Sequence, residues 1–245
     1  MTLPNDLPLQ RLQFYATTPY ACGYLEGKQA QSLIATPHHL IDNEVYSDLI
    51  QLGFRRSGKF VYRPHCEHCN ACVPVRLLVD EFAPNRSQRR AARQHQTLAA
   101  TIVPLTFKQA HFELYAAYQI ARHEGTNAKE AVEQYRNFLV QSNVESLMVE
   151  FRLDDVLKII SVVDIVRDGV SAVYTFYDTS DKSASYGTYN VLWLAEWCRS
   201  LQLPHLYLGY WIEKSPKMAY KQNFVPQEGL VEGEWQRLNH ASKSP

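Results

Sequence analysis

The sequence predicts an α+β fold, and three consecutive patterns in its second half carry this prediction. Residues 156–166 and 170–177 are rich in β-branched and aromatic side chains and are separated by Asp168-Gly169, the strongest short-range signal of a β-hairpin. Residues 186–201 then repeat apolar side chains at helical spacing, and the apolar run 205–212 is too short for a helix and suits a central strand. We expect this order to form a cleft where the helix N-terminus meets the strand ends.

Residues 1–98 are expected to form an N-terminal domain that carries a cysteine-rich loop. Apolar periodicity bounded by turn residues predicts short helices over 26–35 and 45–52. A strand over 73–79 follows the cysteines, and a capped helix over 88–96 closes the domain.

Residues 99–245 are expected to form the second domain, which contains the hairpin. Amphipathic patterns predict helices over 106–124 and 128–141, and strand character resumes over 144–152. Two further short strands are expected over 223–225 and 229–235.

Length and composition indicate a folded protein of a reducing compartment. The chain has 245 residues, of which 46% are hydrophobic. No apolar run approaches the roughly 18 residues needed to span a bilayer, and the N-terminus lacks the pattern of a signal peptide. The five cysteines are an odd number, which suits reduced thiols or a metal site better than a disulfide framework. We therefore expect a cytoplasmic protein without a membrane partner.

Positive charge is concentrated in one segment of a neutral chain. The net charge is zero, yet residues 55–95 hold nine Lys or Arg side chains against three acidic ones. Such a segment is the footprint of a contact with a polyanion, although a solvated helix face is the ordinary alternative.

Three cysteines stand at regular spacing in Cys66-x-x-Cys69-x-x-Cys72. A structural zinc site or an iron–sulfur cluster needs a fourth ligand. The candidates for that ligand are Cys22, His65 and His68. The alternative is a set of small thiols buried in a tight loop, since free cysteine is among the most buried residues.

Arginines flank the cysteine loop on both sides. Arg55, Arg56 and Arg76 lie in strand-like segments, and a guanidinium offers a planar fork suited to carboxylate or phosphate. Exposed side chains with partial ion pairing are the alternative. A second group of arginines lies on the expected helix over 88–96 and the turn before it, where Arg86, Arg93 and either Arg89 or Arg90 share one face. Its members are Arg86, Arg89, Arg90 and Arg93.

Acidic and aromatic side chains mark the ends of the central strands. Asp178 ends the strand run before the predicted helix, where a carboxylate can orient an amine, accept a proton or cap a turn. Tyr207, Tyr210 and Trp211 form an aromatic strand, a pattern that is more often core than binding platform. Downstream, Lys217 and Lys221 fall on one face of a short helix that begins near Pro216.

The order of several motifs resembles the bacterial aspartate/glutamate leucyltransferases of the arginyl-tRNA-protein transferase family. The resemblance spans about residues 14–235. The motifs are Cys22-Gly-Tyr-Leu, Gly53-Phe-Arg-Arg-Ser-Gly, the run from Tyr62 to Arg76, Ser87-Gln-Arg-Arg, Ser171-Ala-Val-Tyr-Thr-Phe-Tyr-Asp, Tyr207-Leu-Gly-Tyr-Trp-Ile and Met218-Ala-Tyr-Lys.

This resemblance implies a fold and an activity. The fold would be an N-terminal cysteine-bearing domain and a C-terminal GNAT-like acyltransferase domain, whose mixed, mainly antiparallel sheet is flanked by helices. The activity would move leucine from Leu-tRNA to the N-terminal amine of proteins that start with Asp or Glu, the N-degron reaction. No cofactor is required for such a transfer, and the resemblance leaves open whether Cys22, Cys66, Cys69 and Cys72 hold zinc or an iron–sulfur cluster.

Site roles follow from combining the resemblance with the residues. The acidic side chain of the acceptor is expected at Arg55, Arg56 or Arg76, and Asp178 is expected to orient or deprotonate its amine. Tyr210 is expected to be a second catalytic residue that lines the aminoacyl pocket. The expected substrate pocket adds Tyr62, Tyr207 and Trp211. The residues expected to contact tRNA are Arg86, Arg89, Arg90, Arg93, Lys217 and Lys221.

Three rival functions remain to be separated. An arginyl-tRNA-protein transferase would use the same acceptors. A CoA-dependent N-acetyltransferase would want a glycine-rich loop at the helix start, whereas residues 183–188 contain a single glycine. A metal-dependent RNA-binding module would explain the cysteines and arginines and leave the aromatic core without a purpose.

Overall fold

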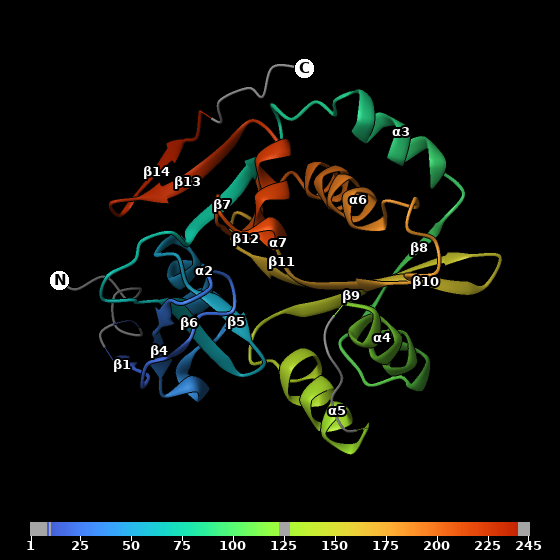
Figure 1. The fold of residues 1–245 in the computed structure, drawn as a ribbon. Helices are drawn as coiled ribbons and strands as arrows, with labels where there is room; N and C mark the ends of the chain where they lie inside the picture. The colour runs from blue at the N-terminus through green and yellow to red at the C-terminus, as the bar shows by residue number, and fades with distance from the viewer. Residues whose placement is uncertain (1–8, 10, 123–127, 240–245) are drawn as a thin grey trace.

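A large mixed sheet occupies the centre of the computed structural model, which describes residues 9, 11–122 and 128–239 (Figure 1). Its strands are β7 (Val73–Leu78), β8 (Ala99–Pro104), β9 (Ser146–Leu153), β10 (Val156–Val166), β11 (Gly169–Tyr177), β12 (His205–Trp211), β13 (Gln227–Val231) and β14 (Glu234–Arg237). In space they follow the order β14-β13-β7-β12-β11-β10-β9-β8. β11 and β12 run parallel, and the other neighbours are antiparallel. The sheet is therefore mixed and mainly antiparallel, as expected.

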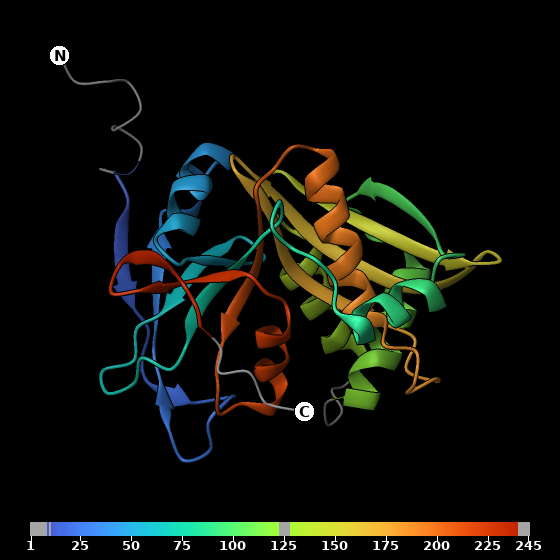
Figure 2. The ribbon, with the colours of Figure 1, turned by 90° about the horizontal axis from the view of Figure 1, so that it is seen from above.

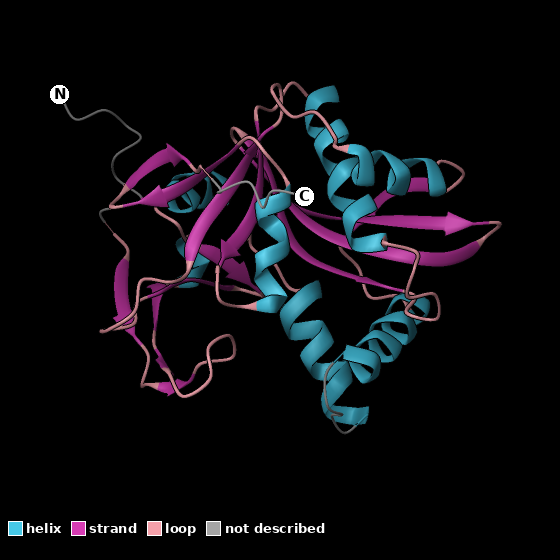
Figure 3. Cartoon of the chain, turned by 45° about the horizontal axis from the view of Figure 1, so that its top comes forward, coloured by secondary structure: helices cyan, strands magenta, loops and turns pink. Residues whose placement is uncertain are grey.

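Helices cover both faces of this sheet (Figure 3). They are α2 (Asn43–Gln51), α3 (Arg86–Gln94), α4 (Gln109–Arg122), α5 (Ala128–Tyr135), α6 (Tyr186–Ser200) and α7 (Pro216–Ala219), with shorter turns η1 (His38–Leu40), η2 (Arg136–Val140) and η3 (Tyr220–Asn223). α6 and α3 lie on one face, and α4 and α5 lie on the other (Figure 1). Within the described ranges, no helix combines the length and apolar character that crossing a membrane would demand.

The central hairpin, the helix after it and the next strand confirm the sequence prediction. β10 and β11 pair over most of their length, and α6 and β12 follow with the expected bounds. Leu194, Ala195 and Cys198 on α6 are fully buried against the sheet. A Cβ on Gly169 would stand 2.4 Å from the carbonyl oxygen of His205, so only glycine lets β11 begin this close to β12.

A smaller sheet at the N-terminal side overturns one predicted helix. It contains β1 (Gln13–Ala16), β4 (Ser32–Thr36), β6 (Phe60–Pro64) and β5 (Arg55–Ser57), in that spatial order, and β2 (Tyr20–Ala21) pairs separately with β3 (Gln29–Ala30). The helix predicted over 26–35 was wrong. β4 is paired on both sides, with β1 and β6, and this pairing overrides the local helix preference of the segment.

Several other boundaries differ from the prediction. β7 comes from the expected N-terminal domain but pairs with β12 and β13, so the division at residue 98 cuts across the large sheet. β8 was not predicted and forms the edge beside β9. The helix expected over 106–124 is α4, which spans Gln109–Arg122, and the expected positions 123 and 124 lie outside the described residues. The helix expected over 128–141 ends its α-helical part at Tyr135, and residues 223–225 form no strand.

The two sheets are joined by a buried ion pair between Arg56 on β5 and Asp164 on β10. The Arg56 Nη2 donates to the Asp164 carboxylate at 2.7 Å, and the two side chains are 1% and 0% exposed. The hydroxyl of Ser146 donates to the same carboxylate at 2.6 Å. Further Arg56 hydrogen bonds reach the carbonyls of Gly58 and Gln141. Every strong donor and acceptor of the pair is thus satisfied inside the protein. The N-terminal elements, blue and cyan in Figure 2, gather on one side of the molecule.

Replacing Asp164 with Asn should lower the free energy of unfolding by about 3–5 kcal/mol, because it leaves a buried guanidinium without its counter-charge. Urea unfolding followed by circular dichroism measures the change. Asp155→Asn, at an exposed turn, is the matched control and should change stability by less than about 0.5 kcal/mol. Equal midpoints for the two variants would contradict the structural role of the pair.

Candidate active site

A cavity of about 1080 Å³ opens between the N-terminal segments and the large sheet. Its walls come from parts of residues 20–32, the cysteine loop, the middle of β11, the first turns of α6, and residues 216–221. The cleft expected at the N-terminus of the helix is therefore present. It draws residues from both halves of the chain, and it is large enough for a ligand of drug size or more.

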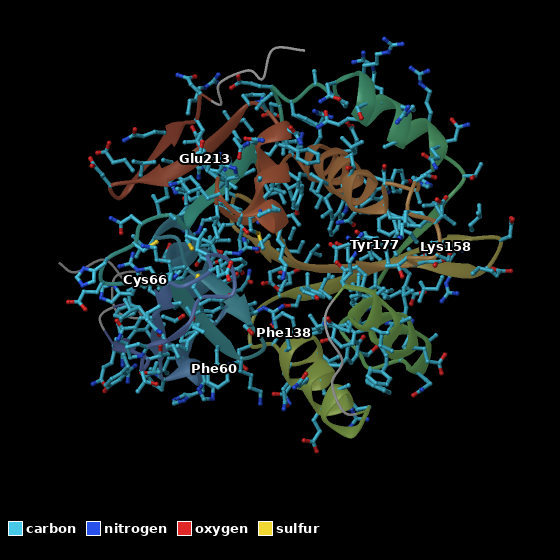
Figure 4. The ribbon with its side chains drawn as sticks, viewed as in Figure 1. Phe60, Cys66, Phe138, Lys158, Tyr177 and Glu213 are labelled. Carbon is cyan, nitrogen blue, oxygen red and sulfur yellow. The ribbon has the colours of Figure 1, made fainter. Side chains whose placement is uncertain are left out.

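The four expected cysteines all face this cavity and are half-buried (Cys66 is labelled in Figure 4). Burial raises the pKa of the Cys72 thiol to about 12, and the negative charges that Cys66, Cys22 and Cys69 would carry raise it further. The thiols thus interact electrostatically. In the described part of the chain, however, no three His, Cys, Asp or Glu side chains are arranged to hold a metal ion.

Arg55 lies behind the cavity wall without an acidic partner. Its side chain projects from β5 opposite to that of Arg56, since neighbouring side chains of a strand alternate in direction. Its Nη2 donates to the carbonyl of Ala172 on β11 at 2.6 Å. Its Nη1 is buried and, among the described residues, has no hydrogen-bond acceptor. Arg55 therefore retains an unused donor, but this donor is buried and Arg55 is not among the residues that line the cavity.

Lys221 is buried at the cavity instead of being exposed on a basic face. Its Nζ donates to the carbonyl of Tyr210 at 2.6 Å, and its side chain lines the cavity. Desolvation lowers the pKa of Lys221 to about 7, and the positive charge of Arg55 adds to this effect. Lys221 was expected to be exposed and to contact tRNA. The exposure was wrongly predicted, because the 3-10 turn η3 directs this side chain into the protein.

Two of the expected aromatic residues reach the cavity. Tyr62 and Tyr210 line it, and the Tyr210 hydroxyl donates to the carbonyl of Gly53 at 2.9 Å. Burial raises the pKa of Tyr210 well above its ordinary value, so the phenol stays protonated at neutral pH. Tyr207 is 1% exposed and donates to Asp168, which makes it a core residue. Trp211 lines a smaller adjoining cavity of about 510 Å³.

The other two expected acid-binding arginines are occupied by partners within the protein. Arg56 is paired with Asp164. Arg76 bonds Glu228 at 2.8 Å, lies 3.7 Å from Asp168 and sits over the ring of Trp235. Neither lines the cavity. In this structure both guanidinium groups hold the fold together and are not available to a substrate.

Asp178 lies outside the cavity and is paired with Lys158 (Figure 4 labels Lys158). The hydrogen bond from the Lys158 Nζ, at 2.8 Å, is the main cause that lowers the pKa of Asp178 to about 2. A carboxylate with so low a pKa is a poor proton acceptor near neutral pH. The expectation that Asp178 deprotonates an amine is therefore not supported by its geometry.

The remaining expected basic residues lie at the surface. The arginines of α3 are exposed and none lines the cavity; they are Arg86, Arg89, Arg90 and Arg93. Lys217 on α7 is exposed at the rim of the cavity. Of the expected tRNA contacts that are exposed, Lys217 is thus the one next to the cavity, while the buried Lys221 lines it from inside.

The structure also places residues at the site that sequence reasoning missed. Asn190 on α6 is 2% exposed and lines the cavity. Its Oδ1 accepts no hydrogen bond from the described residues. Tyr118 and Tyr177 pack edge to face at 5.0 Å, and Arg122 donates to the Tyr177 hydroxyl. The sequence signal that could have pointed to these aromatic residues is the high tyrosine content of 15 residues. Tyrosine patterns alone do not separate a cavity wall from a core.

The raised pKa of Cys72 predicts slow alkylation by iodoacetamide. At pH 8 a thiol of pKa about 12 is ionised in roughly one molecule in 10⁴, against roughly a quarter for an ordinary cysteine. Mass spectrometry of tryptic peptides should show Cys72 reacting at least about 100-fold more slowly than in the urea-unfolded chain. Reaction at the unfolded rate would contradict the buried position of this thiol.

Comparison with known proteins agrees over both halves of the chain. Residues 20–90 match the family description "Arginine-tRNA-protein transferase, N terminus", and residues 110–231 match "Arginine-tRNA-protein transferase, C terminus". The "Aspartate/glutamate leucyltransferase" of Methylobacillus flagellatus is 70% identical over 240 residues, covering 98% of this chain and 97% of its own. The protein of the same name from Nitrosospira multiformis is 51% identical, covering 100% and 98%.

Solved structures are more distant. The crystal structure of FemX has a TM-score of 0.41 at 9% identity and covers 80% of this chain and 79% of its own. At 70% identity over almost the full length of both chains, the sequence relationship is the decisive one. The chain belongs to the arginine-tRNA-protein transferase family.

Proposed function

We propose that this protein is an aminoacyl-tRNA-protein transferase that moves leucine from Leu-tRNA to the N-terminal amine of proteins starting with Asp or Glu. The strongest support is the 70% identity, over 98% of the chain, to a relative named aspartate/glutamate leucyltransferase. The cavity between the N-terminal segments and the sheet is the proposed reaction site. A GNAT-like acyltransferase fold of the second domain is part of the same proposal.

The rate of this reaction depends mainly on how the enzyme positions the α-amine and the ester. The α-amine attacks the ester carbonyl, a C–N bond forms, and the bond from that carbon to the ribose oxygen breaks; the proton lost by the amine balances the one gained by the ribose oxygen. An α-amine has a pKa near 8, so roughly a tenth of it is neutral at pH 7. Holding the ester against this amine supplies most of the acceleration.

The two ends of the cavity suit the two substrates. Arg55, whose Nη1 lacks an acceptor among the described residues, lies behind the lining residue Ala172, near the N-terminal end where the acidic acceptor residue would bind. The first turns of α6, with exposed Arg122 and Lys217 nearby, line the other part, where the esterified tRNA end would enter. The exposed arginines of α3 would contact the tRNA backbone further out.

Cofactor and location are part of the proposal. Transfer from an activated ester changes no oxidation state, so no cofactor is required. Zinc or an iron–sulfur cluster at the four cysteines would serve the structure of the loop. Charged tRNA and reduced thiols both belong to the cytoplasm, where we place the protein.

The rival donors are separated by one assay. Purified protein, an Asp-initiated peptide and leucyl-, phenylalanyl- or arginyl-tRNA are incubated side by side, with acetyl-CoA as a fourth donor. We expect leucyl transfer alone to be efficient. Efficient arginyl transfer would support the alternative that the family description suggests. Acetylation in place of leucyl transfer would contradict the proposal.

Replacing Asp178 with Asn should leave kcat/KM for leucyl transfer within about threefold of the wild type, because a carboxylate already held by Lys158 takes no proton from the amine. Initial rates over a range of acceptor concentrations measure this. A loss of about 100-fold or more, with Leu-tRNA binding intact, would return Asp178 to the role of general base.

A further inference from the structure

The lining of the large cavity is aromatic and basic. The described residues that line it include eight tyrosines and four Lys or Arg side chains, and none of them is Asp or Glu. An unpaired nucleic-acid end offers what such a lining binds, because its bases stack on aromatic rings and its phosphates pair with cations. The place of a base within the cavity then depends on which of the rings are exposed.

Three of the lining tyrosines expose much of their surface. Tyr20, Tyr220 and Tyr24 are 48%, 46% and 40% exposed. Tyr20 and Tyr24 come from the N-terminal segments, where the Tyr20 hydroxyl shares a hydrogen bond of 2.8 Å with Ser32 Oγ. Tyr220 begins the turn η3 in the second half of the chain. The exposed rings therefore stand on two walls, and Tyr220 is the one from the wall that also includes α6 and α7.

The ring of Tyr220 is supported from inside the protein although it is exposed. It meets the ring of Phe224 at 86°, with the two centroids 6.4 Å apart. The Lys221 Nζ also lies over the Tyr220 ring, 6.0 Å from its centroid. Both of these neighbours are buried, so they hold the ring from the protein side. A ring held in this way can stack against a base at a small cost in side-chain entropy.

Exposed cations lie at the same end of the cavity as Tyr220. Lys217 stands three positions earlier in the chain, and it is exposed at the rim. Desolvation raises the pKa of Tyr220 to about 12, and the negative charge that Tyr177 would carry adds to this effect, so the two phenols are close in space. The exposed Arg122 donates from Nη2 to the Tyr177 hydroxyl at 3.0 Å (Tyr177 is labelled in Figure 4). This end thus combines an exposed ring with two exposed cations.

We propose that the adenine of the terminal nucleoside of aminoacyl-tRNA stacks on Tyr220. This inference rests on the proposed function, because that function supplies a tRNA donor. The base and the ester are attached to the same ribose, so a stacked base fixes the ester inside the cavity. Arg122 and Lys217 would contact the phosphates of the preceding nucleotides at the rim. Tyr220 is therefore a binding residue that positions the donor.

Isothermal titration with a stable mimic of the donor end tests this inference. The probe is an adenosine that carries leucine through a 3′ amide in place of the ester, so that no transfer occurs during the titration. The matched probe is the same leucyl amide on a ribose with hydrogen in place of the base. With the full-length wild-type protein we expect the adenosine amide to bind at least about tenfold more tightly than the base-free amide.

Tyr220→Ala should raise the Kd of the adenosine amide by about tenfold or more and leave the Kd of the base-free amide unchanged. Tyr220→Phe keeps the ring, and its Kd for the adenosine amide should stay within about threefold of the wild type, because stacking does not use the hydroxyl. Tyr20→Ala is the matched control, an equally exposed tyrosine of the same cavity, and should change neither Kd. Circular dichroism checks that each variant folds.

Two results would overturn the inference. One is an unchanged Kd of the adenosine amide in folded Tyr220→Ala, and the other is a selective loss in Tyr20→Ala in its place, which would put the base on the N-terminal wall. Should Tyr220→Ala fail to fold, the wild type is photo-crosslinked to the probe with an azide on its adenine. The label must then appear in the segment that contains Tyr220, and labelling that spares this segment would contradict the inference.

Transfer kinetics separate this inference from the proposed function. With Leu-tRNA and an Asp-initiated peptide as substrates, Tyr220→Ala should raise KM for Leu-tRNA and leave KM for the peptide unchanged. Leucyl transfer with the same KM for Leu-tRNA in the wild type and in Tyr220→Ala sinks the inference alone. Base-selective binding of the amide without any leucyl transfer by the wild type sinks the proposed function alone.

Discussion

The buried ion pair between Arg56 and Asp164 sets the geometry on which the site depends. It fixes β5 of the small sheet to β10 of the large one, with both side chains removed from water. Because neighbouring side chains of a strand alternate in direction, anchoring Arg56 on one side sends Arg55 to the other. There Arg55 contacts β11 and β12 behind the cavity wall. Arg56 therefore stabilises the fold, whereas the neighbouring Arg55 has no acidic partner among the described residues.

This arrangement explains why the cavity needs both halves of the chain. The cysteine loop and Tyr62 come from the N-terminal segments, while β11, α6 and Lys221 come from the second half. β7 ties the halves together by pairing between β12 and β13 inside the large sheet. A division of the chain into two independent domains would separate the walls of the cavity. The reaction that we propose for this protein likewise needs two substrates to be held together, an acidic acceptor and an aminoacyl ester.

The sequence predicted the central elements well because their patterns are local. The Asp168-Gly169 turn and the helical period of residues 186–201 reappear as the β10–β11 hairpin and α6. The roles of Arg55 and Arg56 could not be separated in this way, since the partner that distinguishes them, Asp164, lies 108 positions along the chain. Lys221 looked like part of a basic surface, and the turn η3 buries it. Asp178 was correctly placed at a strand end, while the pairing with Lys158 that lowers its pKa depends on the neighbouring strand.

The central claim is that the acidic group of the acceptor meets Arg55 while Arg56 stays with Asp164. A crystal structure of the protein bound to a succinyl peptide, which is an Asp-initiated peptide without its α-amino group, measures this directly. The account predicts the side-chain carboxylate at about 2.7–2.9 Å from the Arg55 Nη1, with the Arg56–Asp164 pair unchanged. A carboxylate bound instead by Arg56 or Arg76, with Arg55 uninvolved, would contradict it.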